Sequence, residues 1–381
     1  MDIAFLTTSL ERGGAETQLV RIAATLRRRG WEVGILTMLP SSAFLDEIGA
    51  AGIPLVQCAD ARARIPWRTA AQMLRQLRRW RPALLVTFNF PADLFGRVCG
   101  RLAGVPTIIS ALGTTHIRSS ARRAFYRCTE PLIAMTVANS LAAARAMVAR
   151  RTLSFAKTRV IPNGLILAPP DGRSHRAEMR AELGVEDPEF LWVAVGNLRP
   201  AKDYPTLLNA AARCARVAGG FRILIVGGDF AGALKDAAGV PWAQALRRRA
   251  AELELGGVVG FLGARPDVPH LLQAADAFVL SSAWEGMPNT VMEAMASGLP
   301  VVATAVGDVG ELVEEGVSGF VVPPGDPHLL AERMLATMAL PQAKRQAMGA
   351  AGMERIRSRY ENERVVDEWE ALLRGLAAAA P

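Results

Sequence analysis

Two glutamates, Glu285 and Glu293, stand eight positions apart in the segment SSAWEGMPNTVMEAMASGLPVVAT. Glu285 ends a short apolar run and opens a turn, and Glu293 falls just inside a helix that we predict to begin near Pro288. Proline is tolerated there because the N–H that it lacks has no partner in the first turn of a helix. A strand, a sharp turn and a helix N-terminus together favour a phosphorylated ligand. The two carboxylates could therefore address different parts of one nucleotide-sized molecule. The alternative is a surface turn with two solvated glutamates.

A second candidate site is the loop GNLRPAKDYP, which follows the predicted strand FLWVAV and leads into a predicted helix. It contains Gly196, Asn197, Arg199 and Lys202. A glycine turn, two cations and a helix N-terminus can hold a diphosphate. Lys202 is notable because only four of the 44 basic residues are lysine. The alternative is that these cations pair with neighbouring acids such as Asp203.

Two weaker signals lie in the first half of the chain. Gly13 and Gly14 precede a predicted helix, and Glu16 would lie in its first turn, where a carboxylate suits the helix dipole whatever its function. The segment lacks the G-x-G-x-x-G pattern of dinucleotide-binding loops. His116, one of four histidines, follows the predicted strand PTIIS. A single histidine is often structural or solvated, so these residues alone do not define a site.

Length and composition favour two globular domains. A chain of 381 residues is long for one core. It has no uninterrupted apolar run of about 18–20 residues, so we predict no membrane-spanning helix. The first residues, MDIAFLTTSL, lack the basic region of a signal peptide. The four cysteines are scattered without a C-x-x-C spacing, which argues against a zinc site or a disulfide framework and suits the cytosol.

The two halves of the chain carry opposite net charge. Residues 1–170 contain 23 Lys and Arg against 9 Asp and Glu, whereas residues 171–381 contain 21 against 27. This asymmetry predicts that the first half meets an anionic partner: a membrane surface, a lipid diphosphate or a nucleic acid. The acidic second half and the lack of an RNA-recognition signature argue against nucleic acid. Arg-rich codon usage is the alternative, but it does not explain the unequal halves. The basic clusters are Arg27–Arg29, the segment 67–81, and Arg118, Arg122, Arg123 and Arg127.

The order of the predicted elements favours an α/β fold with a parallel sheet in each half, because short β-rich runs alternate with helical patterns. We predict an N-terminal domain over residues 1–165, a linker over 166–188 that is rich in proline, glycine and charge, and a second domain over 189–359. A final helix covers 360–379. Ligands of such sheets bind at the carboxyl ends of the strands.

The segment around Glu285 and Glu293 resembles the E-x7-E signature of the retaining family-4 glycosyltransferases, of the type that builds bacterial exopolysaccharide, capsule or lipopolysaccharide. The match extends from AFVLSS through EAMASGLPVVAT to VGELVEEGVSGFVVPPGDP. The resemblance implies the GT-B fold: two facing Rossmann-like domains with a cleft between them, and a C-terminal helix that crosses back onto the N-terminal domain. GNLRPAK is similar to the family's G-R-L-x-x-x-K loop, although Asn197 stands where arginine is usual. GGAE resembles the family's G-G-x-E loop.

The resemblance also implies an activity. The enzyme would move a hexose from a nucleotide diphosphate sugar, UDP more than GDP, to a glycan or a polyprenyl-diphosphate-linked acceptor. Lys202 and Arg199 would neutralise the diphosphate, Glu293 would bind the ribose, Glu285 would bind the hexose, and His116 would reach toward the donor sugar. The remaining donor-binding residues would be Gly13, Gly14, Gly196, Asn197, Arg265, Met287, Pro288, Asn289 and Thr290. No D-x-D motif occurs, so no metal or other cofactor is expected. The expected location is cytoplasmic, peripheral at the inner face of the plasma membrane.

Other functions fit the same fold. A UDP-sugar 2-epimerase would bind the same donor, but we find no acid/base residues placed to act on C2 of the sugar. A non-catalytic partner subunit is disfavoured because Glu285, Glu293 and Lys202 are all present. A Rossmann dehydrogenase lacks its fingerprint here.

Overall fold

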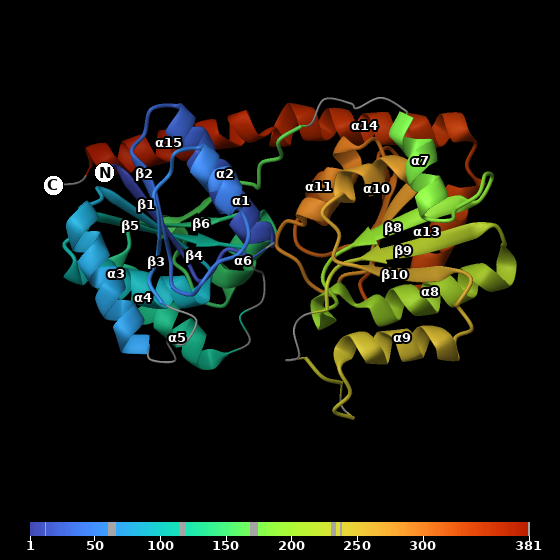
Figure 1. Cartoon of the computed structure of the whole chain (residues 1–381), viewed down its shortest axis with the longest axis horizontal. Helices are drawn as coiled ribbons and strands as arrows, with labels where there is room; N and C mark the ends of the chain where they lie inside the picture. The colour runs from blue at the N-terminus through green and yellow to red at the C-terminus, as the bar shows by residue number, and fades with distance from the viewer. Residues whose placement is uncertain are drawn as a thin grey trace. The chain divides into compact units, whose positions relative to one another are not determined.

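The computed structural model describes residues 1–11, 13–59, 66–113, 117, 119–167, 174–229, 234–236 and 238–379. They form two compact units (Figure 1). Unit 1 comprises Met1–Ile166 with Tyr360–Pro381, and unit 2 comprises Leu167–Arg359. The chain therefore leaves unit 1 after its first 166 residues and returns to it for the last helix.

Unit 1 is built on a seven-stranded parallel sheet in the order β3-β2-β1-β4-β5-β6-β7. Its strands are β1 (Ile3–Thr7), β2 (Val33–Thr37), β3 (Leu55–Gln57), β4 (Leu84–Phe88), β5 (Thr107–Leu112), β6 (Met135–Ala138) and β7 (Thr158–Val160). Every residue of β1, β2, β4 and β5 is buried. Parallel strands covered on both faces read as continuous apolar runs, which is why the sequence shows them clearly.

Helices cover both faces of this sheet (Figure 1). They are α1 (Gly14–Arg28), α2 (Leu45–Ala50), α3 (Pro66–Trp80), α4 (Phe90–Leu102), α5 (Ser120–Cys128), α6 (Leu141–Ala149) and α15 (Asn362–Ala378). Ile3 and Phe5 of β1 belong to the core cluster with α1 and α15, whereas Ala4 and Leu6 belong to the cluster with α3 and α4. Successive side chains of a strand point to opposite faces, so β1 contributes to both cores.

The last helix, α15, is held on α1 by apolar packing and by ion pairs. Its buried side chains recur at helical spacing: Val365, Val366, Trp369, Leu372 and Leu373. Arg29, beside the end of α1, pairs with Glu363 at 2.6 Å, Asp367 at 2.7 Å and Glu370 at 2.8 Å. The charge of Arg29 is thus engaged within unit 1.

Unit 2 repeats the plan with a six-stranded parallel sheet in the order β10-β9-β8-β11-β12-β13. The strands are β8 (Phe190–Val195), β9 (Phe221–Val226), β10 (Val259–Gly263), β11 (Ala277–Leu280), β12 (Val301–Thr304) and β13 (Gly319–Val322). The helices are α7 (Ser174–Glu182), α8 (Tyr204–Val217), α9 (Trp242–Glu252), α10 (Val268–Ala274), α11 (Asn289–Ala296), α12 (Val309–Leu312), α13 (Pro327–Ala339) and α14 (Gln342–Tyr360). The predicted α/β class with two parallel sheets is confirmed.

Part of the predicted linker over 166–188 is ordered structure instead. Residues 174–182 form α7, which belongs to unit 2. Arg176 and Arg180 donate to the carbonyl of Ala274 at the end of α10, at 2.8 and 3.3 Å, and both pair with Asp276. These bonds tie α7 to unit 2, an arrangement that the composition of the segment did not reveal.

Both sheets have a switch point where the strand order reverses. In unit 1 the chain runs from β1 outward through β2 and β3, then returns to β4 on the other side of β1. In unit 2 it runs from β8 through β9 and β10, then returns to β11 on the other side of β8. Loops leaving adjacent strands diverge at such points, which leaves room for a ligand at the carboxyl edge of the sheet.

Candidate functional site

The switch point of unit 2 brings together the two segments that the sequence singled out. The amide of Ala283, after β11, donates to the carbonyl of Ala201, after β8, at 2.8 Å. The hydroxyl of Ser281 donates to the carbonyl of Lys202 at 2.8 Å. Lys202 Nζ lies 2.8 Å from Glu285 Oε1, and these side chains are only 19% and 18% exposed. The structure therefore joins two predicted site residues in a half-buried ion pair.

Glu285 is also held from a second side. Ser282 Oγ donates to Glu285 Oε1 at 2.7 Å, and Thr304 Oγ1, at the end of β12, donates to the Ser282 carbonyl at 2.7 Å. Ser282 and Thr304 are fully buried. Sequence reasoning missed Ser282, although two serines directly after the apolar strand AFVL were a usable signal.

Gly196 gives the loop after β8 the space that Lys202 needs. A Cβ at Gly196 would lie 2.5 Å from Lys202 Cε. Tyr204 OH donates to the Gly196 carbonyl at 2.6 Å. Burial, and then the charge of Glu285, raise the pKa of Tyr204 above its usual range, so this hydroxyl remains a donor. The Lys202 side chain thus passes over Gly196, whose carbonyl oxygen is held by the hydroxyl of the buried Tyr204.

The other predicted residues of this loop have structural neighbours as well. Asn197 Oδ1 accepts from the amide of Gly228 at 3.2 Å, and the amide of Leu198 donates to the Gly228 carbonyl at 3.0 Å. These bonds join the loop after β8 to the loop after β9. Arg199 stands directly before the short 3₁₀ turn Pro200–Lys202, in the same loop as the lysine.

Helix α11 begins at Asn289, directly after Pro288, and the predicted start of this helix is confirmed. Glu293 lies within it, half-buried. Thr290 Oγ1, in the first turn, is buried and has no hydrogen-bond partner among the described residues. A buried hydroxyl is costly to leave unpaired, so it is available to a ligand at this helix end. Met287, just before the helix, is buried.

The loop after β12 packs against the turn that contains Glu285. The amide of Asp308 donates to the Gly286 carbonyl at 2.9 Å. Gly307 has a φ of +54°, and a Cβ there would collide with the Gly286 carbonyl oxygen. Only glycine adopts this conformation at so close an approach without strain. The turn at Glu285 is therefore shaped by a third loop of the same sheet edge.

Arg265, one of the expected donor-binding residues, is engaged by carboxylates. It binds both oxygens of Asp267, at 2.8 and 2.6 Å, and Glu182 of α7 at 2.7 Å. The hydrogen bonds from Arg265 lower the pKa of Asp267. This cluster fastens α7 to the loop after β10.

The switch point of unit 1 carries the Gly13 and Gly14 loop. Glu16 Oε1 accepts from Asn89 Nδ2 at 2.8 Å, across the gap between the ends of β1 and β4. A Cβ at Gly13 would lie 2.5 Å from Glu16 Oε2, so this glycine leaves room for the carboxylate. His116 lies outside the described residues. Gly13 and Gly14 belong to unit 1, whereas Lys202 and Glu285 belong to unit 2.

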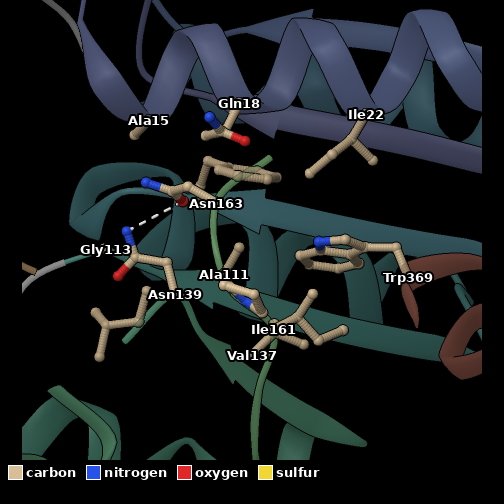
Figure 2. A pocket seen from close by; sticks show the side chains of 13 residues that line it. Ala15, Gln18, Ile22, Ala111, Gly113, Val137, Asn139, Ile161, Asn163 and Trp369 are labelled. Carbon is tan, nitrogen blue, oxygen red and sulfur yellow. Dashed lines mark hydrogen bonds between the residues drawn. The ribbon is translucent and has the colours of Figure 1, made fainter. Parts of the chain in front are cut away.

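A pocket opens at the carboxyl edge of unit 1 (Figure 2). None of the described residues that line it is charged. Its apolar wall includes Ile22, Phe88, Val137, Ile161 and Trp369, and its polar groups include Gln18, Asn139 and Asn163. Asn139 Nδ2 donates to Asn163 Oδ1 at 3.2 Å, while Asn139 Oδ1 is buried without a partner in the described part of the chain. The sequence did not indicate this pocket, because its lining comes from separate helices and strand ends.

The residues that the structure describes contain neither a metal-binding cluster nor a membrane-spanning helix. Within these residues, no group of three or more His, Cys, Asp or Glu side chains could hold a metal ion. No helix in the same residues is long and apolar enough to cross a membrane.

Both units of the chain match known protein families. Residues 12–168 match the family model "Glycosyltransferase Family 4", and residues 175–355 match "Glycosyl transferases group 1". A D-inositol 3-phosphate glycosyltransferase of Nocardia farcinica is 30% identical over 344 residues, which cover 82% of this chain and 74% of that protein. The UDP-Gal:alpha-D-GlcNAc-diphosphoundecaprenol alpha-1,3-galactosyltransferase of Escherichia coli is 23% identical over 298 residues, 74% of this chain and 73% of that protein.

A solved structure is similar along nearly the whole chain. The crystal structure of HepE from Anabaena in complex with UDP-glucose aligns with a TM-score of 0.83 and 25% identity, covering 98% of this chain and 100% of HepE. With the two family models and the Nocardia relative, this similarity identifies the chain as a member of the family-4 glycosyltransferases, an enzyme with the GT-B fold.

Proposed function

We propose that this enzyme transfers a hexose from a nucleotide diphosphate sugar, UDP rather than GDP, to a glycan or lipid-linked glycan in the synthesis of a cell-surface polysaccharide. The observation that carries the proposal is the Lys202–Glu285 pair at the switch point of unit 2. Two similar proteins support it: HepE was solved in complex with UDP-glucose, and the E. coli relative is named as a UDP-Gal transferase with a diphosphoundecaprenol-linked acceptor.

In this proposal the donor diphosphate lies at the loop after β8. Lys202 and Arg199 neutralise its charge, and the first amides of α11 with Thr290 Oγ1 donate hydrogen bonds to it. Cations and a helix N-terminus beside a departing diphosphate stabilise it, because they lie next to the oxygens on which negative charge develops. Glu293, one turn into α11, accepts from the ribose hydroxyls. This arrangement assigns no role to a metal ion.

Glu285 binds the hexose in this proposal. Glycosyl transfer passes through an oxocarbenium-like transition state, in which positive charge develops at the anomeric carbon. A carboxylate held by Ser282 at 2.7 Å can orient the sugar and stabilise that charge. The anomeric configuration is retained, as in the family that the chain belongs to.

A thermal-shift screen with UDP, GDP, ADP and their common sugar conjugates tests the donor site. Saturating ligand at a hundredfold excess over Kd raises the free energy of unfolding by about 2.7 kcal/mol. We expect one nucleotide series to shift the melting temperature, and the Glu293→Ala variant to shift less. NMR of the product formed from that donor then shows whether the anomeric configuration is retained. A screen without any shift would contradict the proposal.

We also propose that unit 1 meets its acceptor at an anionic membrane surface, through the face formed by α3, α4 and α5. Residues 66–129 contain eleven arginines and a single acid, Asp93, which is fully buried. Exposed cations lie on all three helices: Arg68, Arg75, Arg78 and Arg79 on α3, Arg101 on α4, and Arg122 and Arg127 on α5. Within the described residues, no carboxylate forms an ion pair with these arginines.

Exposed apolar side chains accompany this charge. Trp67, in the first turn of α3, is 73% exposed, and Leu102, the last residue of α4, is 61% exposed. Arg78 Nη2 donates to the Leu102 carbonyl at 3.2 Å, so α3 and α4 present one continuous surface. Arginines beside exposed apolar groups suit the interface of an anionic bilayer, where each cation near the surface contributes about 1 kcal/mol.

The cluster Arg27–Arg29, which the sequence placed in the same role, is a different case. Arg28 pairs with Glu363 at 2.8 Å, and Arg29 binds three carboxylates of α15. Charges paired in this way attract an anionic surface little. The proposal therefore rests on α3, α4 and α5 and excludes the end of α1.

Vesicle flotation tests the membrane proposal. We expect the protein to bind vesicles of phosphatidylglycerol and phosphatidylcholine, and to bind pure phosphatidylcholine much less. The double variant Arg75→Glu with Arg79→Glu should lose most of this binding, whereas Arg216→Glu, on the exposed face of α8 in unit 2, should retain it. Equal binding to both kinds of vesicle would contradict the proposal.

A further inference from the structure

The ion pair at the switch point of unit 2 involves the cation that the donor needs. Lys202 Nζ and Glu285 Oε1 are 2.8 Å apart, and both side chains are about four-fifths buried. A diphosphate that binds Lys202 therefore approaches a carboxylate already bonded to the same ammonium group. Two anions on one ammonium repel each other strongly where water screens them poorly.

We propose that Glu285 competes with the donor's β-phosphate for Lys202, and that diphosphate binding moves Lys202 from the carboxylate to the phosphate. This inference rests on the proposed function. As a consequence, the parts of the donor are bound in a fixed order. Glu285 becomes available to the hexose only after the diphosphate has bound Lys202. A nucleoside monophosphate has no β-phosphate, so it leaves the Lys202–Glu285 pair in place.

The surroundings of the pair indicate which partner moves. Glu285 Oε1 also accepts from Ser282 Oγ at 2.7 Å, and Ser282 is fixed by Thr304, so the carboxylate is anchored in the sheet edge. Lys202 lies across Gly196, where a Cβ would come within 2.5 Å of its Cε. A lysine has a flexible four-carbon stem and three rotatable donors, so it can change partner without a backbone movement. Lys202 is thus the mobile partner and Glu285 the fixed one.

Calorimetric titration with UDP and UMP, and with GDP and GMP, tests the exchange. The variants are Glu285→Gln, Lys202→Met and the double variant. Glutamine keeps the shape of the side chain and an acceptor for Ser282, but it does not hold the lysine by charge. We expect Glu285→Gln to bind the diphosphate about three- to tenfold more tightly than the wild type, because the phosphate no longer has to displace a carboxylate from Lys202. Affinity for the monophosphate should stay the same, which also shows that the variant is folded.

The double variant separates exchange from simple charge repulsion. If Glu285 acts through Lys202, then Glu285→Gln should give no gain in the Lys202→Met background. A gain of the same size there, or an equal gain with the monophosphate, would overturn the exchange. So would the absence of any gain in the single variant. Asp203→Asn is the charge-matched control, because Asp203 neighbours Lys202 but accepts from Thr206 Oγ1 at 2.7 Å; its diphosphate affinity should match the wild type.

Failure of the proposed function gives a different result. If the wild-type protein bound none of the four nucleotides, the donor site itself would be wrong and the inference would fall with it. If the wild type bound diphosphates but Glu285→Gln gave no gain, or gave the same gain with and without Lys202, only the exchange would be wrong.

Discussion

The two units share a sheet topology but build the carboxyl edge of that sheet differently. At the switch point of unit 2, Lys202 and Glu285 form a half-buried ion pair supported by Ser282. The edge of unit 1 carries a pocket whose described lining residues are apolar side chains and amides, with Asn139 Oδ1 unpaired among them. The same fold thus offers a charged site in one unit and an uncharged one in the other. The strand order fixes where loops meet, and the loop residues decide what they bind.

The two edges also differ in how their loops are fastened. In unit 2 the loops are joined by direct backbone contacts, such as that between Gly307 and the Gly286 carbonyl. In unit 1, side-chain amides bridge the segments: Gln18 of α1 donates to the Gly164 carbonyl at 2.8 Å and accepts from its amide at 2.9 Å. Substitutions at the edge of unit 2 should therefore affect donor binding and catalysis, whereas those in unit 1 should affect stability.

The largest expected effect is that of Lys202→Met on catalysis. Removing a donor that stabilises charge developing in the transition state typically lowers kcat by about 10²–10³-fold. Steady-state transfer assays with the donor found by thermal shift measure it. The control is Lys344→Met, the same substitution at an exposed position of α14, which should leave kcat unchanged. If both variants retained wild-type activity, the charged edge of unit 2 would have no catalytic role, and it would not differ in function from the edge of unit 1.

The next effect is that of Gly307→Ala on the shape of the same edge. The residue has a φ of +54°, and the added Cβ would meet the Gly286 carbonyl oxygen. We expect unit 2 to lose about 2–3 kcal/mol of unfolding free energy, because strain and overpacking add. Donor affinity should fall as the turn at Glu285 shifts. Gly310→Ala, three residues on, adds a Cβ that meets nothing within 4 Å and should be close to neutral. Equal urea midpoints for the two variants would contradict this account.

A charge introduced at the edge of unit 1 should act on stability instead. Gln18 is 3% exposed, and Gln18→Glu loses the N–H that binds the Gly164 carbonyl at 2.8 Å. We expect about 2 kcal/mol of destabilisation in urea unfolding, because the new carboxylate is buried and faces the Gly164 carbonyl oxygen, which among the described residues keeps only the bond from Arg21 Nη1 at 3.0 Å. Affinity for the nucleotide should not change. Gln72→Glu, at an exposed position of α3, is the control and should change neither quantity. A loss of nucleotide affinity in Gln18→Glu would show that the two edges are not independent.

The difference between the edges also explains what the sequence could reveal. Strands such as FLWVAV and AFVL are continuous apolar runs because both faces of a parallel sheet are covered. The start of α11 after Pro288 follows from the local chemistry of a helix N-terminus. Such features depend on neighbours along the chain, so the sequence predicts the α/β class, both sheets and the loop and helix start that meet at the edge of unit 2.

Contacts between distant segments were not predicted. Lys202 and Glu285 are 83 positions apart, and they meet only because β11 returns beside β8. The resemblance to the family assigned both residues to one donor but did not indicate that they pair. The composition places α7 in the linker because Asp276, the residue that holds this helix, is a hundred positions from Arg176. The uncharged pocket of unit 1 has no local signature at all.

The smallest effect, and the one that depends on pH, lies where α15 is fastened to unit 1. Glu370 binds Arg29 at 2.8 Å, Trp31 Nε1 at 3.1 Å and Arg374 at 2.6 Å. These bonds, first that of Arg29, lower the pKa of Glu370 from 4.5 to about 2. A carboxyl group whose pKa is lower in the folded protein stabilises it fully above the unfolded value, and this contribution disappears as the pH falls toward the folded value.

Glu370→Gln should therefore lower the unfolding free energy of unit 1 by about 1 kcal/mol at pH 7, and by progressively less as the pH falls from 4.5 toward 2. Urea unfolding of wild type and variant over this range measures the difference. Glu368→Gln on the same helix is the control: Glu368 has no ion pair among the described residues, so its difference should stay near zero throughout. A difference for Glu370→Gln that did not change with pH would mean that the side chain acts through its shape. The ion pairs on α15 would then add nothing to the hold that Trp369 and its apolar neighbours already have on unit 1.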